Sequence, residues 1–332
     1  MGDPAGIGPE IIVKAWSALR EQGPPFLVVG DVQLLSAAPD AGSAPMQRIA
    51  SPEDALRVFP RAIPVLDLPL QAQVVAGKPS PAYAGAVIRW IETGAGLALS
   101  GAVAGLVTAP IAKEPLYQAG FKFPGHTEFL GELTRAQDLE APHGPVMMLT
   151  AGGLRTTLVT IHQSLASVPA AISRQAIVDK GLVTARALAA DFGVAHPRLA
   201  VAALNPHAGE KGAFGREEQE IIAPACAELR RLGVDCADPR PADSLFHAEA
   251  RRGYDAVVCM YHDQALIPVK MLDFWGGVNV TLGLRIVRTS PDHGVGFDIA
   301  GRGHARADSM IAAIRMAAEI AVRRSQAGVR AA

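Results

Sequence analysis

Short apolar runs alternate with longer amphipathic stretches along most of the chain. The apolar runs predict strands at residues 25–30, 101–110, 156–162, 199–207, 255–262 and 279–284. The amphipathic stretches predict helices at residues 8–19, 83–99, 173–193, 216–233 and 307–325. Many of the strand runs are continuously apolar, which is expected when a strand is covered on both faces. The pattern predicts an α/β fold with a mostly parallel sheet, and the proline-rich segment 60–82 is expected to be a loop.

Length and composition narrow the class of protein. A chain of 332 residues is long enough for two domains or for one large α/β unit. Hydrophobic residues make up 49% and charged residues 19%, so the chain can bury a large core. Because the net charge is -1 and no dense basic stretch occurs, we expect neither nucleic acid nor an anionic membrane as the main partner. No apolar run approaches the ~20 residues needed to span a bilayer.

The cysteines indicate a reducing compartment. The chain has three cysteines, Cys226, Cys236 and Cys259. An odd number does not pair fully into disulfides, and no CxxC spacing typical of a metal finger occurs. No signal peptide is evident either, so we expect a cytoplasmic protein. In that setting the cysteines are expected to be packing residues.

Three of the predicted strands end in a histidine: His162, His207 and His262. Ligands collect at the carboxyl ends of strands in open α/β sheets, so the three imidazoles could converge. Three imidazoles with one water or substrate oxygen form a common divalent-metal shell, and imidazole favours Zn, Co, Ni or Fe over Mg. Asp263 would then hydrogen-bond a ligating histidine from behind or contact the substrate. The alternative is that each histidine is an ordinary polar residue, as we expect for the solvent-facing histidines 143, 196, 247 and 304.

Two further segments are candidates for anion binding. Gly125, His126 and Thr127 precede an amphipathic stretch, where the free N–H groups and the dipole of a helix favour an anion; a plain N-cap is the alternative. The glycine-rich segment 205–218 would either cradle a ligand or form a flexible loop. Basic and amide side chains that suit a phosphate or carboxylate then follow His262 at intervals of eight, nine and nine residues: Lys270, Asn279 and Arg288.

Several familiar motifs are absent from the sequence. It contains no Walker A, HExxH or GxSxG motif, and no GxGxxG in the strand-to-helix order that a Rossmann turn needs. The residues alone therefore indicate a metal-dependent α/β enzyme that acts on an anionic small molecule.

A set of short blocks resembles the 4-hydroxythreonine-4-phosphate dehydrogenase (PdxA) family of vitamin B6 biosynthesis. The blocks occur in family order along nearly the whole chain: MGDPAGIGPEI (1–11), LVTAPIAK (106–113), PGHTEFL (124–130), TIH (160–162), LNPHAGE (204–210), PAD (241–243), MYHDQALIPVK (260–270), VNVTLGL (278–284), and RTSPDHG and FDIAG within 288–301. Each block is short, but together they are highly specific.

The resemblance implies a two-domain fold like that of isocitrate and isopropylmalate dehydrogenases. Mostly parallel sheets, a cleft between the domains and a homodimer are expected. The first domain would comprise residues 1–123 plus about 294–332, and the second, residues 124–293, would carry the metal and the dimer interface. Family members usually have a short strand before the GDPAGIGPE block, so that N-terminal strand is expected to be missing here.

The resemblance also assigns roles to residues. One divalent metal per active site (Zn, Co or Mg) would be held by His162, His207 and His262, with one of these histidines supplied by the other subunit. The substrate contacts would be His126, Thr127, Asp243, Lys270, Asn279 and Arg288. The candidate proton acceptors are Asp263, Lys270 and water. NAD, or NADP, would bind the segment HGVGFDIAG at His293, Gly294, Phe297, Asp298, Ala300 and Gly301.

The implied reaction is the oxidation of 4-phosphooxy-L-threonine to 2-amino-3-oxo-4-phosphooxybutanoate, which decarboxylates to 3-amino-2-oxopropyl phosphate. Related branches oxidise 4-phospho-D-threonate, 4-phospho-D-erythronate or an aromatic cis-dihydrodiol dicarboxylate. Retention of Lys270, Asn279 and Arg288 favours a phosphorylated substrate over the dihydrodiol. From other classes, a metal-dependent hydrolase or aldolase would use the same histidines without NAD, and a solute-binding module would carry a secretion signal.

Overall fold

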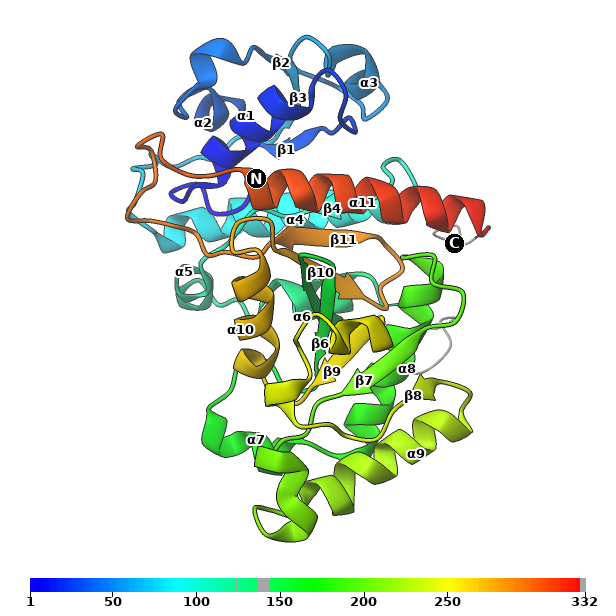
Figure 1. Cartoon of the computed structure of the whole chain (residues 1–332). Helices are drawn as coiled ribbons and strands as arrows, with labels where there is room; N and C mark the ends of the chain where they lie inside the picture. Colours follow the sequence, from blue (N-terminus) through cyan, green and yellow to red (C-terminus); the bar gives the residue numbers. More distant parts are fainter. Residues whose placement is uncertain (124, 136–143, 329–332) are drawn as a thin grey trace. The chain divides into compact units, whose positions relative to one another are not determined.

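The computed structural model describes residues 1–123, 125–135 and 144–328 (Figure 1). The chain forms two compact units. Unit 1 contains Met1–Ala136 and Arg285–Val322, and unit 2 contains Gln137–Leu284 and Arg323–Gly328. Strand β11, Arg288–Pro291, pairs with a strand of unit 1. The expected domains, residues 1–123 plus about 294–332 and residues 124–293, stay a prediction. The cleft expected between the domains stays a prediction.

Unit 1 contains a small parallel sheet with strand order β1-β3-β2, and a separate parallel pair, β4 with β11. Its other strands are β1 Val28–Gly30, β2 Met46–Arg48, β3 Ile63–Asp67 and β4 Leu106–Val107. Its helices are α1 Gly8–Leu19, α2 Val32–Ser36, α3 Asp54–Val58, α4 Ala84–Leu99, α5 Lys113–Gln118 and α6 His126–Leu133, and α11 Asp308–Gln326 begins in this unit.

Helix α1 supplies much of the core of unit 1. The predicted helix at 8–19 is confirmed, with Pro9 in its first turn, where a missing N–H costs nothing. Ile11 and Trp16 are fully buried against β3, and the Trp16 indole donates to the carbonyl of Phe59 at 2.8 Å. This burial explains one error: residues 63–67, which lie within the segment predicted as loop, form β3 because α1 covers them.

Unit 2 is built on strands in the order β10-β5-β6-β9-β7-β8. The pairs β6–β9, β9–β7 and β7–β8 are parallel, whereas β10–β5 and β5–β6 are antiparallel. The strands are β5 Val146–Ala151, β6 Leu154–Leu158, β7 Arg198–Val201, β8 Asp235–Cys236, β9 Ala256–Cys259 and β10 Val278–Leu282. The helices are α7 Val168–Ala171, α8 Arg174–Ala190, α9 Ala223–Arg231 and α10 His262–Leu272, and a π-helix, Glu218–Ile222, precedes α9.

The strands of unit 2 bury both faces. In β9, Ala256 and Val258 pack into the cluster formed with α8 and α9, while Val257 and Cys259 pack into the cluster that includes Ala265 of α10. Alternation along a strand sends successive side chains to opposite faces, so a strand covered twice must be continuously apolar. The expected α/β class with mostly parallel strands is confirmed.

The cysteines and the absence of a membrane-spanning run were also predicted from the sequence. The three cysteines are buried and free, as packing residues would be. Within the described ranges, no helix is both long enough and apolar enough to cross a membrane.

Candidate active site

The carboxyl ends of β6, β9 and β7 lie at one edge of the sheet in unit 2, because these neighbouring strands are parallel. His162, His262 and His207 follow these three strands in turn, a few residues beyond each end. Figure 1 shows β6, β9 and β7 side by side, with α10 beginning near the end of β9. The strand order therefore directs all three histidines to the same edge.

Two of the three histidines meet. The ring centres of His162 and His262 are 5.6 Å apart, with the planes inclined by 44°. Nδ1 of His262 lies 2.7 Å from Oδ1 of Asp263. A carboxylate accepts from this nitrogen, so Nε2 of His262 carries the lone pair that a metal would bind. Adjacent imidazoles, one of them oriented by a carboxylate, fit a divalent metal as donors.

His207 neighbours a different ring. It sits in an exposed turn with φ +52°, and its ring centre is 6.2 Å from that of Phe214. In the part of the chain that the structure describes, no group of three or more His, Cys, Asp or Glu residues is arranged to hold a metal ion. Within the described residues, one chain therefore brings His162 and His262 together without a third such ligand arranged beside them for a metal.

The other candidates of unit 2 lie on separate elements. Nζ of Lys270, on α10, is 5.2 Å from the ring centre of Phe274. Oδ1 of Asn279, on β10, is buried without a hydrogen-bond partner among the described residues. A buried acceptor without a partner is unusual in a folded protein, and it suits a ligand donor. Asp243 is exposed in the short 3₁₀ helix Ala242–Ser244.

In unit 1, His126 and Thr127 are the first two residues of α6, and Gly125 is the N-cap. Among the described residues, no side chain makes a capping hydrogen bond to this helix, so the plain N-cap given as the alternative is not formed by a side chain. Nε2 of His126 is buried and has no hydrogen-bond partner in the described chain, although the residue as a whole is partly exposed. Burial, and then the positive charges of Arg288 and Lys113, hold the pKa of His126 well below its ordinary value. The ring is therefore neutral at neutral pH.

Arg288 is the buried cation of this region. It is 3% exposed at the start of β11, and its Nη2 donates to Oγ1 of Thr108 at 2.7 Å. Burial lowers the pKa of the guanidinium to about 10, while the carboxylate of Glu128 acts in the opposite direction. The guanidinium is still charged at neutral pH. Unit 1 therefore places the buried cation of Arg288 close enough to lower the pKa of His126, whose neutral imidazole stands at the N-terminus of α6. This set suits an anion.

The predicted cofactor segment 293–301 is held closely by backbone contacts within unit 1. The N–H of Ile7 donates to the carbonyl of Val295 at 2.9 Å. A Cβ at Gly77 would lie 2.7 Å from the carbonyl oxygen of Phe297, and one at Gly301 would lie 2.8 Å from the Cβ of Ala76. Glycine is therefore required for these two close approaches, at positions that also have positive φ.

His293 shows a fit to a ligand in the same segment. Its Nδ1 lies 3.0 Å from the carbonyl oxygen of Gly294, so Nδ1 must donate and Nε2 carries the lone pair. This Nε2 is buried and has no hydrogen-bond partner in the described chain. Phe297 is partly exposed, Asp298 and Gly294 are exposed, and Ala300 is buried. A backbone-lined segment with an unpartnered imidazole nitrogen fits a dinucleotide, which needs close backbone approach.

Several residues that support these sites were not among the predicted site residues. A Cβ at Gly125 would lie 3.3 Å from Nζ of Lys113, so this lysine stands at the start of α6. Lys113 ends the block LVTAPIAK (106–113), which shortly precedes Gly125. Its place in that block was the sequence signal that could have identified it as a site residue. Glu10 and Glu218 were also missed, because a glutamate within a helix pattern is most often solvated; both are buried here.

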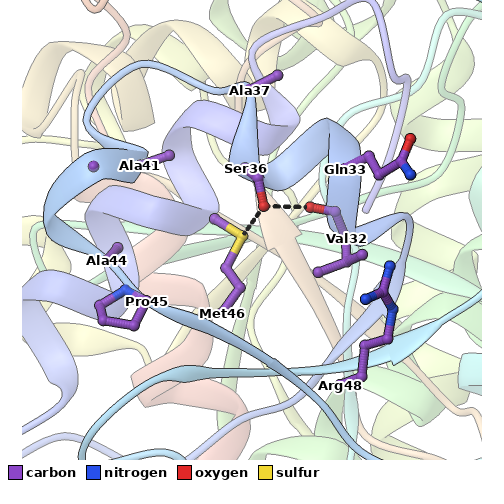
Figure 2. Close-up of a pocket in the computed structure, with 10 residues that line it drawn as sticks. Val32, Gln33, Ser36, Ala37, Ala41, Ala44, Pro45, Met46 and Arg48 are labelled. Carbon is purple, nitrogen blue, oxygen red and sulfur yellow. Dashed lines mark hydrogen bonds between the residues drawn. The ribbon is translucent and has the colours of Figure 1, made fainter.

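A pocket of about 650 Å³ lies in unit 1, away from the candidates above (Figure 2). Oγ of Ser36 donates to the carbonyl of Val32 at 2.8 Å and lies 3.2 Å from the sulfur of Met46. Nε of Arg48 donates a hydrogen bond to Oδ2 of Asp67 at 2.6 Å. None of the predicted site residues is in the lining, which consists of Val32, Gln33, Ser36, Ala37, Ala41, Gly42, Ala44, Pro45, Met46 and Arg48.

Comparison with known proteins gives a consistent result. A model of the family described as pyridoxal phosphate biosynthetic protein PdxA matches residues 22–317. The 4-hydroxythreonine-4-phosphate dehydrogenase of Caulobacter vibrioides is 68% identical over 323 residues, which cover 97% of this chain and 96% of that protein.

Solved structures agree with this match. The 4-hydroxythreonine-4-phosphate dehydrogenase from Klebsiella pneumoniae has a TM-score of 0.82 at 40% identity, covering 97% of this chain and 98% of that one. A terephthalate 1,2-cis-dihydrodiol dehydrogenase from Burkholderia xenovorans has a TM-score of 0.63 at 29% identity, covering 96% of each chain. The resemblance of the short sequence blocks is thereby confirmed, and the chain belongs to the pyridoxal phosphate biosynthetic protein PdxA family.

Proposed function

We propose that this chain is an NAD- and divalent-metal-dependent dehydrogenase of vitamin B6 biosynthesis. It would oxidise 4-phosphooxy-L-threonine to 2-amino-3-oxo-4-phosphooxybutanoate. The alcohol carbon would give up a hydride, which bound NAD⁺ would accept, and the hydroxyl proton would go to a base. The 3-oxo acid then loses its carboxylate as CO₂ to give 3-amino-2-oxopropyl phosphate. Family membership and the name of the 68% identical relative support this substrate.

The observation that carries the proposal is the pair His162 and His262, oriented by Asp263. These imidazoles would hold the divalent metal, Zn, Co or Mg. A bound metal would supply Lewis-acid polarisation of the substrate oxygens. Asp263 keeps the Nδ1 proton on His262, so that Nε2 stays available as a donor. Asp263 and Lys270 are the side chains proposed for proton transfer.

The residues of unit 1 supply phosphate binding in this proposal. The charged guanidinium of Arg288 and the N-terminus of α6, with Thr127, attract the anion. The neutral ring of His126, with its proton on Nε2, then donates one hydrogen bond from this buried nitrogen to the phosphate. Within unit 2, Lys270, Asn279 and Asp243 are the remaining substrate contacts.

The proposed cofactor site is the segment 293–301, which binds NAD or NADP. Within it, His293 offers an acceptor nitrogen, and the exposed Gly294 has no Cβ to keep a ligand from its backbone. The half-buried Phe297 offers an apolar surface, and the exposed Asp298 offers a hydrogen-bond acceptor for a ribose hydroxyl.

We propose a homodimer in which the partner supplies the third metal ligand. Among the described residues of one chain, His162 and His262 lie together but no group of three ligands is arranged for a metal, so we propose that His207 of a second copy completes the set. Helix α10 begins at His262 and then exposes Ile267 at 62% and Met271 at 81%. Phe274 and Trp275 follow and are also exposed. An exposed apolar surface on the helix of a metal ligand is suited to the second copy.

The function is tested by NADH formation with purified protein, NAD⁺ and a divalent metal. The substrates are 4-phosphooxy-L-threonine, 4-phospho-D-threonate and 4-phospho-D-erythronate, each with a chelator control. We expect a chelator-sensitive signal with the first substrate. A signal only with the two sugar-acid phosphates would contradict the proposed pathway while keeping the mechanism, and turnover that survives the chelator would contradict the metal.

A further inference from the structure

The turn that carries His207 has an unusual backbone. It is the short segment Pro206–Gly212, in which His207, Ala208, Glu210 and Lys211 all have φ between +42° and +56°, and Gly209 has φ +78°. Left-handed conformations are unfavourable for residues with a Cβ and occur mostly as single residues. A run of them persists only where surrounding structure holds it in place.

The carboxylate of Glu218 holds this turn. Its Oε1 accepts from the backbone N–H of Leu204 at 2.9 Å and of Asn205 at 2.7 Å. Its Oε2 accepts from the amide Nδ2 of Asn205 at 3.0 Å. A Cβ at Gly209 would lie 2.6 Å from the same Oε2, so the turn rests directly on the carboxylate. Glu218 is only 3% exposed, so water cannot solvate its carboxylate. These hydrogen bonds take the place of that hydration.

The position of Glu218 is fixed in turn by the core of unit 2. Glu218 is the first residue of the π-helix Glu218–Ile222, which leads into α9. Ile222 and Ala225 are fully buried in the cluster shared with α8, so the segment is anchored one turn beyond the carboxylate. A π-helical turn shifts the register of the following side chains, and such turns occur often at functional sites.

We propose that Glu218 is a positioning residue that fixes the His207 turn on the core of unit 2. The inference rests on the proposed function in taking His207 as a metal ligand. Two backbone N–H groups and one amide N–H converge on the carboxylate, so the site needs a group that only accepts. A glutamine would direct its own N–H₂ at the amide of Asn205. If the side-chain amide of Asn205 rotated by 180° to avoid this clash between two N–H₂ groups, Nδ2 of Asn205 would lose its 2.7 Å hydrogen bond to Oε2 of Glu217.

The first test examines the turn itself in metal-free protein. Hydrogen exchange of the Leu204 and Asn205 amides is compared between wild type, Glu218→Gln and a control, Glu220→Gln, whose carboxylate is exposed and pairs with Arg216. We expect exchange at both amides to rise about tenfold or more in Glu218→Gln only, because a bond to a charged acceptor is weakened. Unchanged exchange in Glu218→Gln would overturn the proposal. If that variant fails to fold, Asn205→Ala, which removes one of the three bonds, takes its place, with a smaller expected rise.

The second test connects the turn to the metal. Zn²⁺ affinity is measured by chelator competition for wild type, Glu218→Gln, His207→Ala and the double variant. We expect Glu218→Gln to weaken binding by about 10- to 100-fold, and the double variant to bind no more weakly than His207→Ala. Full additivity, or wild-type affinity in Glu218→Gln, would overturn the link. If His207→Ala binds like wild type, the proposed metal set fails instead, and amide exchange alone decides whether Glu218 holds the turn.

Discussion

At the scale of single residues, His126 shows how burial sets a charge state. Its folded pKa is held below 6.5, the ordinary value, so the folded ring stays neutral where the unfolded ring takes up a proton. The unfolded state therefore binds more protons as the pH falls below 6.5. We expect the free energy of unfolding to fall with the pH in this window, by up to about 1.4 kcal/mol per pH unit from this residue.

The measurement is urea unfolding across that window for wild type and His126→Phe. The variant is expected to lose this part of the pH dependence, because its side chain does not titrate. His196→Phe is the matched control, since His196 is exposed and its loss should leave the slope unchanged. An equal slope in wild type and His126→Phe would show that burial does not perturb this histidine.

Asp263 is a second residue whose contact predicts a measurable effect. Removal of its carboxylate in Asp263→Ala leaves Nδ1 of His262 without its acceptor at 2.7 Å. The ring is then free to change tautomer and orientation, so we expect Zn²⁺ affinity to fall at least about tenfold. Glu249→Ala, at another exposed acid of unit 2, should bind Zn²⁺ like wild type. Equal affinities in the two variants would refute the orienting role.

At the scale of elements, α1 and the segment after the predicted cofactor loop are joined by Lys14 and Glu10. Nζ of Lys14 donates at 2.8 Å to Glu10 and to the carbonyls of Gly303 and Ala305. Oε1 of Glu10 also accepts from the N–H of Ala305 at 2.7 Å, and Glu10 is 1% exposed. The pair therefore fixes residues 303–305 on the first helix of unit 1.

Lys14→Met should destabilise the protein by about 2–4 kcal/mol. The buried carboxylate of Glu10 loses its cation, and two backbone carbonyls lose their donor, while the methionine keeps most of the packing. Equilibrium urea unfolding gives this value. Lys122→Met is the control, because Lys122 is exposed, and its expected change is within about 0.5 kcal/mol. A similarly small change for Lys14→Met would mean that water replaces these bonds.

At the scale of the whole molecule, the exposed apolar surface of α10 predicts an assembly. Met271→Asp places a charge on the surface that we propose the second copy covers. Burying an unpaired carboxylate is costly, so the dissociation constant of the dimer should rise at least about thirtyfold. Sedimentation measures the change. Leu56→Asp, at an exposed leucine of unit 1, should leave a dimer, and an unaltered dimer in Met271→Asp would place the interface elsewhere.

Much of the fold could be predicted because its signal is local. The helix at 8–19 and the helix found at Arg174–Ala190 follow from apolar spacing, and the doubly buried strands follow from continuous apolar runs. Strand β11 was missed because its residues, Arg288–Pro291, are mostly polar although all four are buried. Two of their side chains bond distant partners: Nη2 of Arg288 donates to Oγ1 of Thr108 at 2.7 Å, and Oγ1 of Thr289 donates to the carbonyl of Ala313 at 2.8 Å. No local pattern reports such a bond.

The candidate site divides in the same way. That His162, His207 and His262 follow apolar strands could be predicted, because the alternation of strand and helix depends on neighbouring residues. That His162 and His262 lie together could not, since this depends on β6 lying beside β9. Nor could the π-helical turn at the start of the helix expected at 216–233, whose buried Glu218 accepts from Leu204 and Asn205. Those bonds join residues 14 and 13 positions apart, beyond the spacing of a helix or strand pattern, and they form only when the packed core brings the two segments together.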